Sequence, residues 1–195
     1  VDELQSAFLP GMHEALDYLS TLIELCLINR NVFRTDMGND PRQFLSDMLN
    51  KETPDISKVQ DFLSYQGWDR NDRYLCLRLE AGANTNQIHS AMATLGHIEL
   101  QIPDGCAFIF EQGIVVCINL STKDSSVPEV VSDLAIILRE GLFKMGVSTE
   151  IRDFLYFRQS YLQACAALQL GRKSGTTDWC YRFDDYMLEY VMQRS

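Results

Sequence analysis

Two apolar runs joined by a short polar turn decide the fold of this chain: CAFIF-EQG-IVVCI, residues 106–118. Both runs are rich in β-branched and aromatic residues, which favour extended backbone. The polar stretch between them, Glu111-Gln112-Gly113, contains a glycine suited to a tight turn. The sequence therefore predicts a β-hairpin with strands over Cys106–Phe110 and Ile114–Ile118.

The segments around this hairpin predict a split βαβ unit. A β-favouring run from Arg73 to Glu80 indicates a strand, and a helix is expected across Asn86–Leu95. After the hairpin, Ser126 with Glu129 forms a capping box that begins a helix, and Gly146-Val147-Ser148 begins another candidate strand. The resulting order, β-α-β-β-α-β, is that of the ferredoxin-like fold.

Helices are expected before and after this core. Asp40-Pro41 and Thr53-Pro54 each combine an N-cap with a proline at the first helical position, so two short helices should follow them. Their predicted buried faces are Phe44, Leu45, Met48 and Leu49 in the first helix, and Ile56, Val59, Phe62 and Leu63 in the second.

An α-β-α extension is expected after the core. It comprises a helix over about Phe157–Leu170 that stops at Gly171, a short strand near Trp179–Tyr181, and a final helix over Asp184–Gln193. In the first of these helices, the spacing assigns Tyr161 to the core and Ser160 to the polar face. The predicted class is thus α/β (α+β), with a ferredoxin-like core, the extension and a helical N-terminal segment.

The N-terminal segment carries an amphipathic helix over about Met12–Asn31. Its apolar stripe must be buried, either on its own domain or on a second copy of the chain. For the second case, the candidates for contact between protomers are Leu16, Leu19, Ile23 and Leu27.

Composition excludes several classes of protein. The 195 residues carry a formal net charge of −10, and so acidic a segment is a poor DNA binder by itself because DNA affinity depends on neutralised phosphates. No run approaches the ~18 apolar residues of a membrane span, and the N-terminus shows no signal peptide. Six cysteines without CxxC spacing indicate reduced thiols. We therefore expect a cytoplasmic protein without a cofactor; no Walker loop, GxGxxG or GxSxG occurs.

Several local sequences, in order, resemble the GGDEF-like domain of PucR/CdaR-type bacterial transcription regulators, a relative of the diguanylate-cyclase fold. The resemblance covers roughly residues 41–195. It rests on Phe44–Asn50, Gly67-Trp68-Asp69 leading into Tyr74–Leu77, Gly146–Ser148, Ser160–Leu168 and Phe183-Asp184-Asp185.

The resemblance implies a domain between an N-terminal sensor and a C-terminal helix–turn–helix. Residues 1–34 would then be a helical linker or the tail of the sensor, and residues 41–195 a degenerate GGDEF-like domain. The function expected is a non-catalytic signal relay and dimerisation segment. It would form a homodimer, respond to a small-molecule effector, and reach DNA only through a domain outside this sequence.

Catalysis is the alternative. A diguanylate cyclase needs carboxylates that hold a divalent metal against a triphosphate, together with a glycine pair in the hairpin turn. Here the turn reads Glu111-Gln112-Gly113, so the motif is missing. Glu80 and Glu111, at adjacent strand ends, remain one conceivable metal pair for a nucleotide-binding or cyclase-like enzyme. A third hypothesis is a small-molecule sensor with its pocket between the two short helices and the sheet.

Overall fold

A computed structural model describes residues 40–51, 53–81, 87–140, 143–175 and 178–193. The chain divides into two units, Val1–Asp40 and Pro41–Ser195, and apart from Asp40 the described residues belong to the second. The predicted helix over Met12–Asn31, its stripe of Leu16, Leu19, Ile23 and Leu27, and the linker assigned to residues 1–34 lie outside the described residues.

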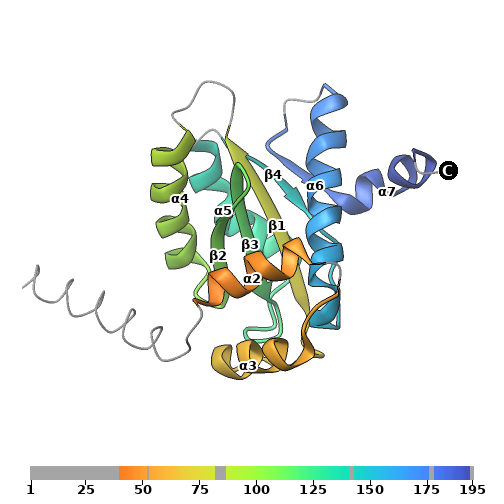
Figure 1. Cartoon of the computed structure of the whole chain (residues 1–195). Coiled ribbons are helices and arrows are strands. Elements are labelled where there is room, and N and C mark those ends of the chain that lie inside the picture. Colours follow the sequence, from red (N-terminus) through yellow and green to blue (C-terminus); the bar gives the residue numbers. More distant parts are fainter. Residues whose placement is uncertain (1–39, 52, 82–86, 141–142, 176–177, 194–195) are drawn as a thin grey trace, which may run out of the picture. The chain divides into compact units, whose positions relative to one another are not determined.

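A five-stranded sheet forms the centre of the second unit, in the order β2-β3-β1-β4-β5 (Figure 1). Neighbouring strands from β2 to β4 are antiparallel, whereas β5 runs parallel to β4. This is the predicted ferredoxin-like arrangement with one added strand. The strands are β1 (Tyr74–Ala81), β2 (Gly105–Phe110), β3 (Gly113–Asn119), β4 (Phe143–Val147) and β5 (Cys180–Arg182).

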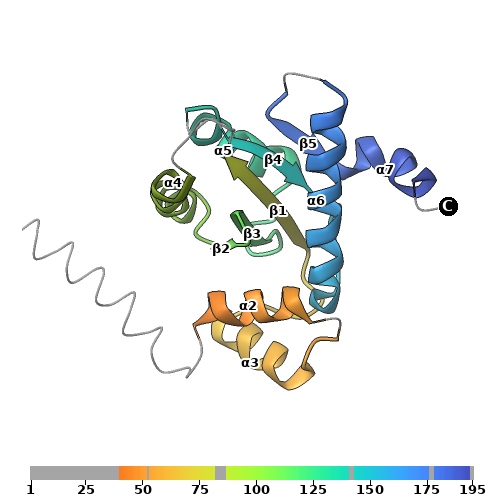
Figure 2. The same ribbon diagram turned by 45° about the horizontal axis from the view of Figure 1, so that its top comes forward.

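Helices cover both faces of the sheet (Figure 2), so the predicted α/β class is confirmed. Two of them, α4 and α5, pack on one face, while α2, α3 and α6 pack on the other. The helices are α2 (Pro41–Asn50), α3 (Ile56–Gln66), α4 (Gln87–Gln101), α5 (Val127–Glu140), the 3-10 turn η1 (Phe154–Tyr156), α6 (Phe157–Lys173) and α7 (Phe183–Met192). None of these helices is long and apolar enough to cross a membrane.

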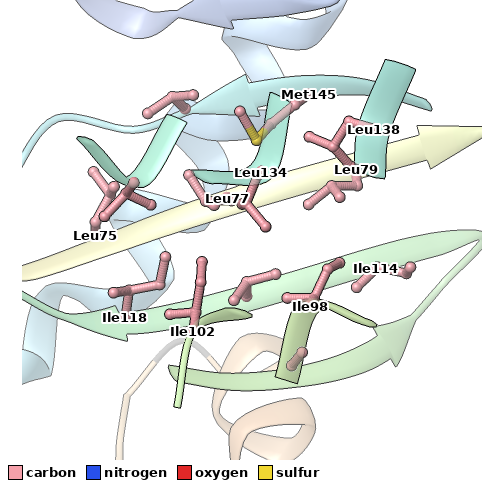
Figure 3. Close-up of a cluster of buried hydrophobic side chains, with 14 of the residues drawn as sticks. Leu75, Leu77, Leu79, Ile98, Ile102, Ile114, Ile118, Leu134, Leu138 and Met145 are labelled. Carbon is pink, nitrogen blue, oxygen red and sulfur yellow. The ribbon is translucent and has the colours of Figure 1, made fainter. Parts of the chain in front are cut away.

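Alternation along β1 produces two cores, one on each face of the sheet. Leu75, Leu77 and Leu79 point toward α4 and α5, where they meet aliphatic side chains such as Ile98 and Leu134 (Figure 3). The intervening residues of β1 face the other way. There, Tyr74 and Cys76 join an aromatic-rich core with α2, α3, η1 and the first turns of α6.

Several predicted boundaries are wrong. The helix expected across Asn86–Leu95 continues to Gln101, and α3 begins at Ile56 with Asp55 as its N-cap, not at the Thr53-Pro54 pair. Two other errors involve glycines. Gly146-Val147-Ser148 does not begin a strand, because β4 ends at Val147. Gly146 is required where α6 crosses the strand, since a Cβ atom there would lie 2.0 Å from the carbonyl oxygen of Ala164. Gly171 does not stop α6 either: it lies inside the helix, where a Cβ atom would lie 2.0 Å from the ring of Tyr181.

Two predictions of burial are also wrong. Ile56 was expected to line the buried face of α3, but it occupies the first turn and is 56% exposed, and the buried face begins at Val59. Ser160 was expected on the polar face of α6, but it is fully buried. It lies on the same side of the helix as Phe157 and Ala164, three residues before and four after it, which pack inward. Among the described residues, its hydroxyl has no hydrogen-bond partner.

Candidate functional site

A buried arginine occupies the end of the sheet where the hairpin turns. Arg78 lies on the central strand β1, on the face toward α6, and its side chain is only 4% exposed. Gly113 makes room for it, because a Cβ atom at that position would lie 3.0 Å from Arg78 Cζ and 2.4 Å from the carbonyl oxygen of Leu79. A buried charge requires compensation by hydrogen bonds or opposite charges.

Four contacts compensate the guanidinium of Arg78: one hydrogen bond, two carboxylates and one aromatic ring. Its Nη1 donates to the carbonyl oxygen of Phe110 at 2.7 Å. Its Nε lies 3.4 Å from Glu80 Oε1, and its Nη2 lies 3.9 Å from Glu111 Oε2. The ring of Tyr161 lies beneath the guanidinium, with its centroid 5.8 Å from Cζ. Arg78 therefore lies between the two glutamates that the sequence offered as a metal pair.

Helix α6 completes this network at both glutamates. Tyr161 donates its hydroxyl to Glu111 Oε2 at 3.1 Å, and burial raises the pKa of Tyr161, so the phenol stays protonated as a donor. Near the end of the helix, Arg172 Nη1 lies 2.6 Å from Glu80 Oε2. We refer to Arg78, Glu80, Glu111, Tyr161 and Arg172 as the Arg78 cluster; it ties β1 and the hairpin to α6.

The hairpin turn differs from the one expected. Gly113 was placed in a three-residue turn, but it is the first residue of β3 and pairs with Phe110, so the turn consists of Glu111 and Gln112. The left-handed backbone conformation falls on Glu111, with a φ of 51°. Such a conformation is costly for a residue with a side chain. The glycine at 113 thus serves the approach of Arg78 and Leu79, not the turn.

These residues do not fit a divalent metal. Glu80 and Glu111 come to the same place, as the sequence indicated, but the guanidinium between them is already a cation and would repel another. Across the described part of the chain, no group of three or more His, Cys, Asp or Glu side chains could hold a metal ion. Sequence reasoning missed Arg78, although an arginine alternating with leucines in a central strand was the available signal.

A second feature is a pocket of about 440 Å³ at the start of α6, here called the η1 pocket. Its walls come from the end of α2, the α2–α3 connection, the first residue of α3, Arg70, η1 with the preceding Asp153, and the first residues of α6; no strand residue is among the described lining residues. The sequence predicted a pocket between the two short helices and the sheet. The η1 pocket does lie against the short helices, but its other side is formed by η1 and α6, not by the sheet. The lining residues are Met48, Lys51, Thr53, Pro54, Ile56, Arg70, Asp153, Leu155, Tyr156, Arg158 and Gln159.

An ion pair holds one wall of the η1 pocket. Arg70 donates from Nε and Nη2 to the two carboxylate oxygens of Asp153, at 2.9 and 2.7 Å. Asp153 Oδ1 also accepts from the backbone N–H of Leu155 at 3.0 Å, so the carboxylate caps η1. The hydrogen bond from Arg70 lowers the pKa of Asp153 and raises that of Arg70.

Comparison with known proteins places this architecture in a family. One stretch is similar to a replicative DNA helicase, DnaB, of Rhodothermus marinus, with 30% identity over 125 residues, which is 60% of this chain. The match spans only 12% of the length of that helicase. No solved structure matches the chain. The model of the GGDEF-like domain matches residues 50–170, from the end of α2 to α6, which include both the sheet end with Arg78 and most of the η1 pocket. The chain therefore belongs to the GGDEF-like domain family.

Proposed function

We propose that this chain is a non-catalytic regulatory segment of a bacterial PucR-type transcription regulator. In this role it relays an effector signal and dimerises in the cytoplasm, and DNA is bound only by a helix–turn–helix outside these 195 residues. Membership of the GGDEF-like family supports a regulatory segment. The acidic charge of −10 supports a division of labour in which another module contacts DNA.

The position of Arg78 carries the non-catalytic part of the proposal. Metal-assisted phosphoryl transfer needs carboxylates that are free to bind a cation beside the triphosphate. Glu80 and Glu111 both contact the Arg78 guanidinium, and Glu80 has a second arginine, Arg172, at 2.6 Å. This arrangement favours a scaffold over the alternative of a nucleotide-dependent enzyme that uses the two glutamates.

The relay part of the proposal is supported by the contacts of α6. Its first turn borders the η1 pocket, its middle crosses β4 at Gly146, and its second half packs on α7. The contact with α7 consists of small and aliphatic residues of α6 against Phe183 and Tyr190. One rigid helix thus connects a ligand-sized pocket with the C-terminal helix, through which a following module would be coupled.

Nucleotide binding and turnover test the non-catalytic part. The purified chain is titrated with GTP and ATP in the presence of Mg²⁺ by isothermal titration calorimetry, and release of phosphate and pyrophosphate is followed. We expect no metal-dependent binding and no turnover. Turnover that is abolished by both Glu80→Gln and Glu111→Gln, and that survives Glu99→Gln at a carboxylate paired with Arg42 away from the cluster, would establish the enzyme instead.

Self-association tests the dimerisation part. Sedimentation equilibrium at micromolar concentrations should show a dimer, and Leu19→Glu together with Ile23→Glu should produce monomers, since a charge is costly in an apolar interface. Leu162→Glu, at an exposed position of α6, is the matched control and should leave the dimer intact. A chain that stays monomeric at every concentration contradicts this part of the proposal.

Helicase activity is not part of the proposal. The similarity to the DnaB helicase covers 12% of that protein, and the sequence of this chain contains no Walker loop for ATP.

A further inference from the structure

We propose that the η1 pocket binds a small organic carboxylate with an apolar body. The inference rests on the proposed relay for the biological role of that ligand, as its effector, but the binding itself follows from the lining of the pocket alone.

The charge of the lining is opposite to that of the protein. Three cationic side chains, Lys51, Arg70 and Arg158, line the pocket with one carboxylate, Asp153, in a chain whose net charge is −10. Counted over the described lining residues, the pocket has an excess of two positive charges, and on so acidic a protein such a pocket favours anions.

Two of these cations are available to a ligand. Arg70 is committed to Asp153 through a bidentate pair. Arg158 donates only its Nε, to the carbonyl oxygen of Leu49 at 3.1 Å, which orients the guanidinium. Within the described residues, neither the terminal nitrogens of Arg158 nor the Lys51 ammonium has a hydrogen-bond or ion-pair partner. An oriented arginine with free terminal nitrogens is suited to a carboxylate.

The uncharged residues of the lining indicate which kind of molecule would carry the carboxylate. Met48, Pro54 and Leu155 are apolar, and the two exposed members, Ile56 and Tyr156, present 56% and 52% of their surface. Exposed apolar side chains beside cations match a molecule that has an apolar body and an anionic end. A volume of about 440 Å³ lies within the usual range of ligand pockets, ~300–1,000 Å³. A nucleoside triphosphate, with its higher charge and polar body, fits this wall poorly.

Ligand binding would join two elements that the fold brings together. Lys51 directly follows α2, whereas Arg158 belongs to the first turn of α6. A carboxylate held by both residues favours the arrangement in which α2 and α6 are close. Because binding shifts the equilibrium toward the state with the higher affinity, the ligand would stabilise that arrangement.

Calorimetry on the whole chain tests the assignment. The probes are benzoate and hexanoate, with benzyl alcohol and benzylamine as neutral and cationic counterparts and inorganic phosphate as a plain anion. We expect the carboxylates to bind with a Kd of about 1 mM or tighter, and the alcohol and amine at least about tenfold more weakly. Lys51→Met and Arg158→Met should each weaken carboxylate binding about tenfold. Lys58→Met, at an exposed position of α3 outside the pocket, should have no effect.

The two pocket variants separate binding from folding. Arg158→Met also removes the hydrogen bond to Leu49, whereas the Lys51 side chain has no such bond among the described residues, so the effect of Lys51→Met reports on the ligand. Carboxylates that do not bind, carboxylates that bind both variants as tightly as the parent chain, or binding of phosphate only would each overturn the assignment. Such a failure with an intact dimer would leave the relay proposal standing, whereas carboxylate binding by a monomeric chain would overturn dimerisation alone.

Discussion

Replacement of Arg78 by methionine tests whether the Arg78 cluster stabilises the fold. Methionine keeps much of the length of the side chain but loses the charge and the donors. The carbonyl oxygen of Phe110 would lose a donor at 2.7 Å, and Glu80 and Glu111 would lose their shared cation.

The expected loss of stability in Arg78→Met depends on how exposed Glu80 and Glu111 are. Removing one member of a fully buried ion pair costs about 3–5 kcal/mol, because the other charge is left uncompensated. Here Glu111 is 65% exposed, and Glu80 is 31% exposed and keeps Arg172, so both carboxylates stay solvated or paired. The principal loss is a charged hydrogen bond to a buried carbonyl group, and we expect the free energy of unfolding to fall by about 2–3 kcal/mol. For a chain of this size, this lowers Tm by roughly 4–12 °C.

Urea unfolding provides the measurement. It is followed by far-ultraviolet circular dichroism and by the fluorescence of the two tryptophans, Trp68 and Trp179. The ring of Trp68 lies 5.8 Å from those of both Phe62 and Tyr74. Coincident transitions by the two probes justify a two-state fit. The control is Arg152→Met, since the side chain of Arg152 is 81% exposed and its ion pair spans 4.0 Å, so the loss should stay below about 0.5 kcal/mol. If Arg78→Met costs no more than this control, the cluster does not stabilise the fold.

Three further predictions concern packing and charge. Gly146→Ala should destabilise the chain by at least about 3 kcal/mol in urea unfolding, because its Cβ atom would meet backbone of α6, whereas Gly96→Ala, with nothing within 4 Å and inside α4, should stabilise it by about 0.5–1 kcal/mol. Ser160→Ala should raise the free energy of unfolding by about 1 kcal/mol, since it removes a buried hydroxyl without a partner among the described residues; a loss of stability would reveal a bond to this hydroxyl. Because its folded pKa is lowered by the hydrogen bond from Arg70, Asp153 contributes stability that is present above its unfolded pKa and lost as the pH falls below about 4. Asp153→Asn should therefore lower the free energy of unfolding at pH 7 and make that free energy fall less steeply at acid pH. Urea unfolding across pH 2–7 measures both effects.

The fold was accessible from the sequence because its signals are local. The hairpin at 106–118, the proline that begins α2, and the 3.6-residue periodicity of α6 each specify an element without reference to the rest of the chain. The errors concern contacts between distant segments. Nothing near Gly171 reveals that the ring of Tyr181 will lie against it, so a glycine required for packing was interpreted as a helix stop.

The candidate site was accessible only in part, for the same reason. The predicted strand order brought Glu80 and Glu111 to one end of the sheet. It did not indicate that Arg78, on the same strand as Glu80, would contact both of them. Whether two carboxylates hold a metal or an arginine depends on which side chain shares their face of the sheet. Arg78 and Glu80 share a face because they lie two residues apart on β1, but the approach of Glu111 follows from the register of β1 against β3, which a single sequence does not specify.

Helix α6 joins the Arg78 cluster and the η1 pocket, and this bears on how a signal would travel. Its 17 residues span about 25 Å, with Arg158 in the pocket at one end and Arg172 on Glu80 at the other. The approach of α6 to the strand at Gly146 leaves no space for the helix to move closer to the sheet, and the Arg78 cluster holds it to the hairpin. Under the proposed relay, a change at the first turn would therefore not be absorbed between α6 and the sheet. It would reach the contact with α7, which consists of apolar and aromatic side chains. The arginine that, in the proposed function, takes the place of a metal between the two glutamates would then also hold α6 to the hairpin for that relay.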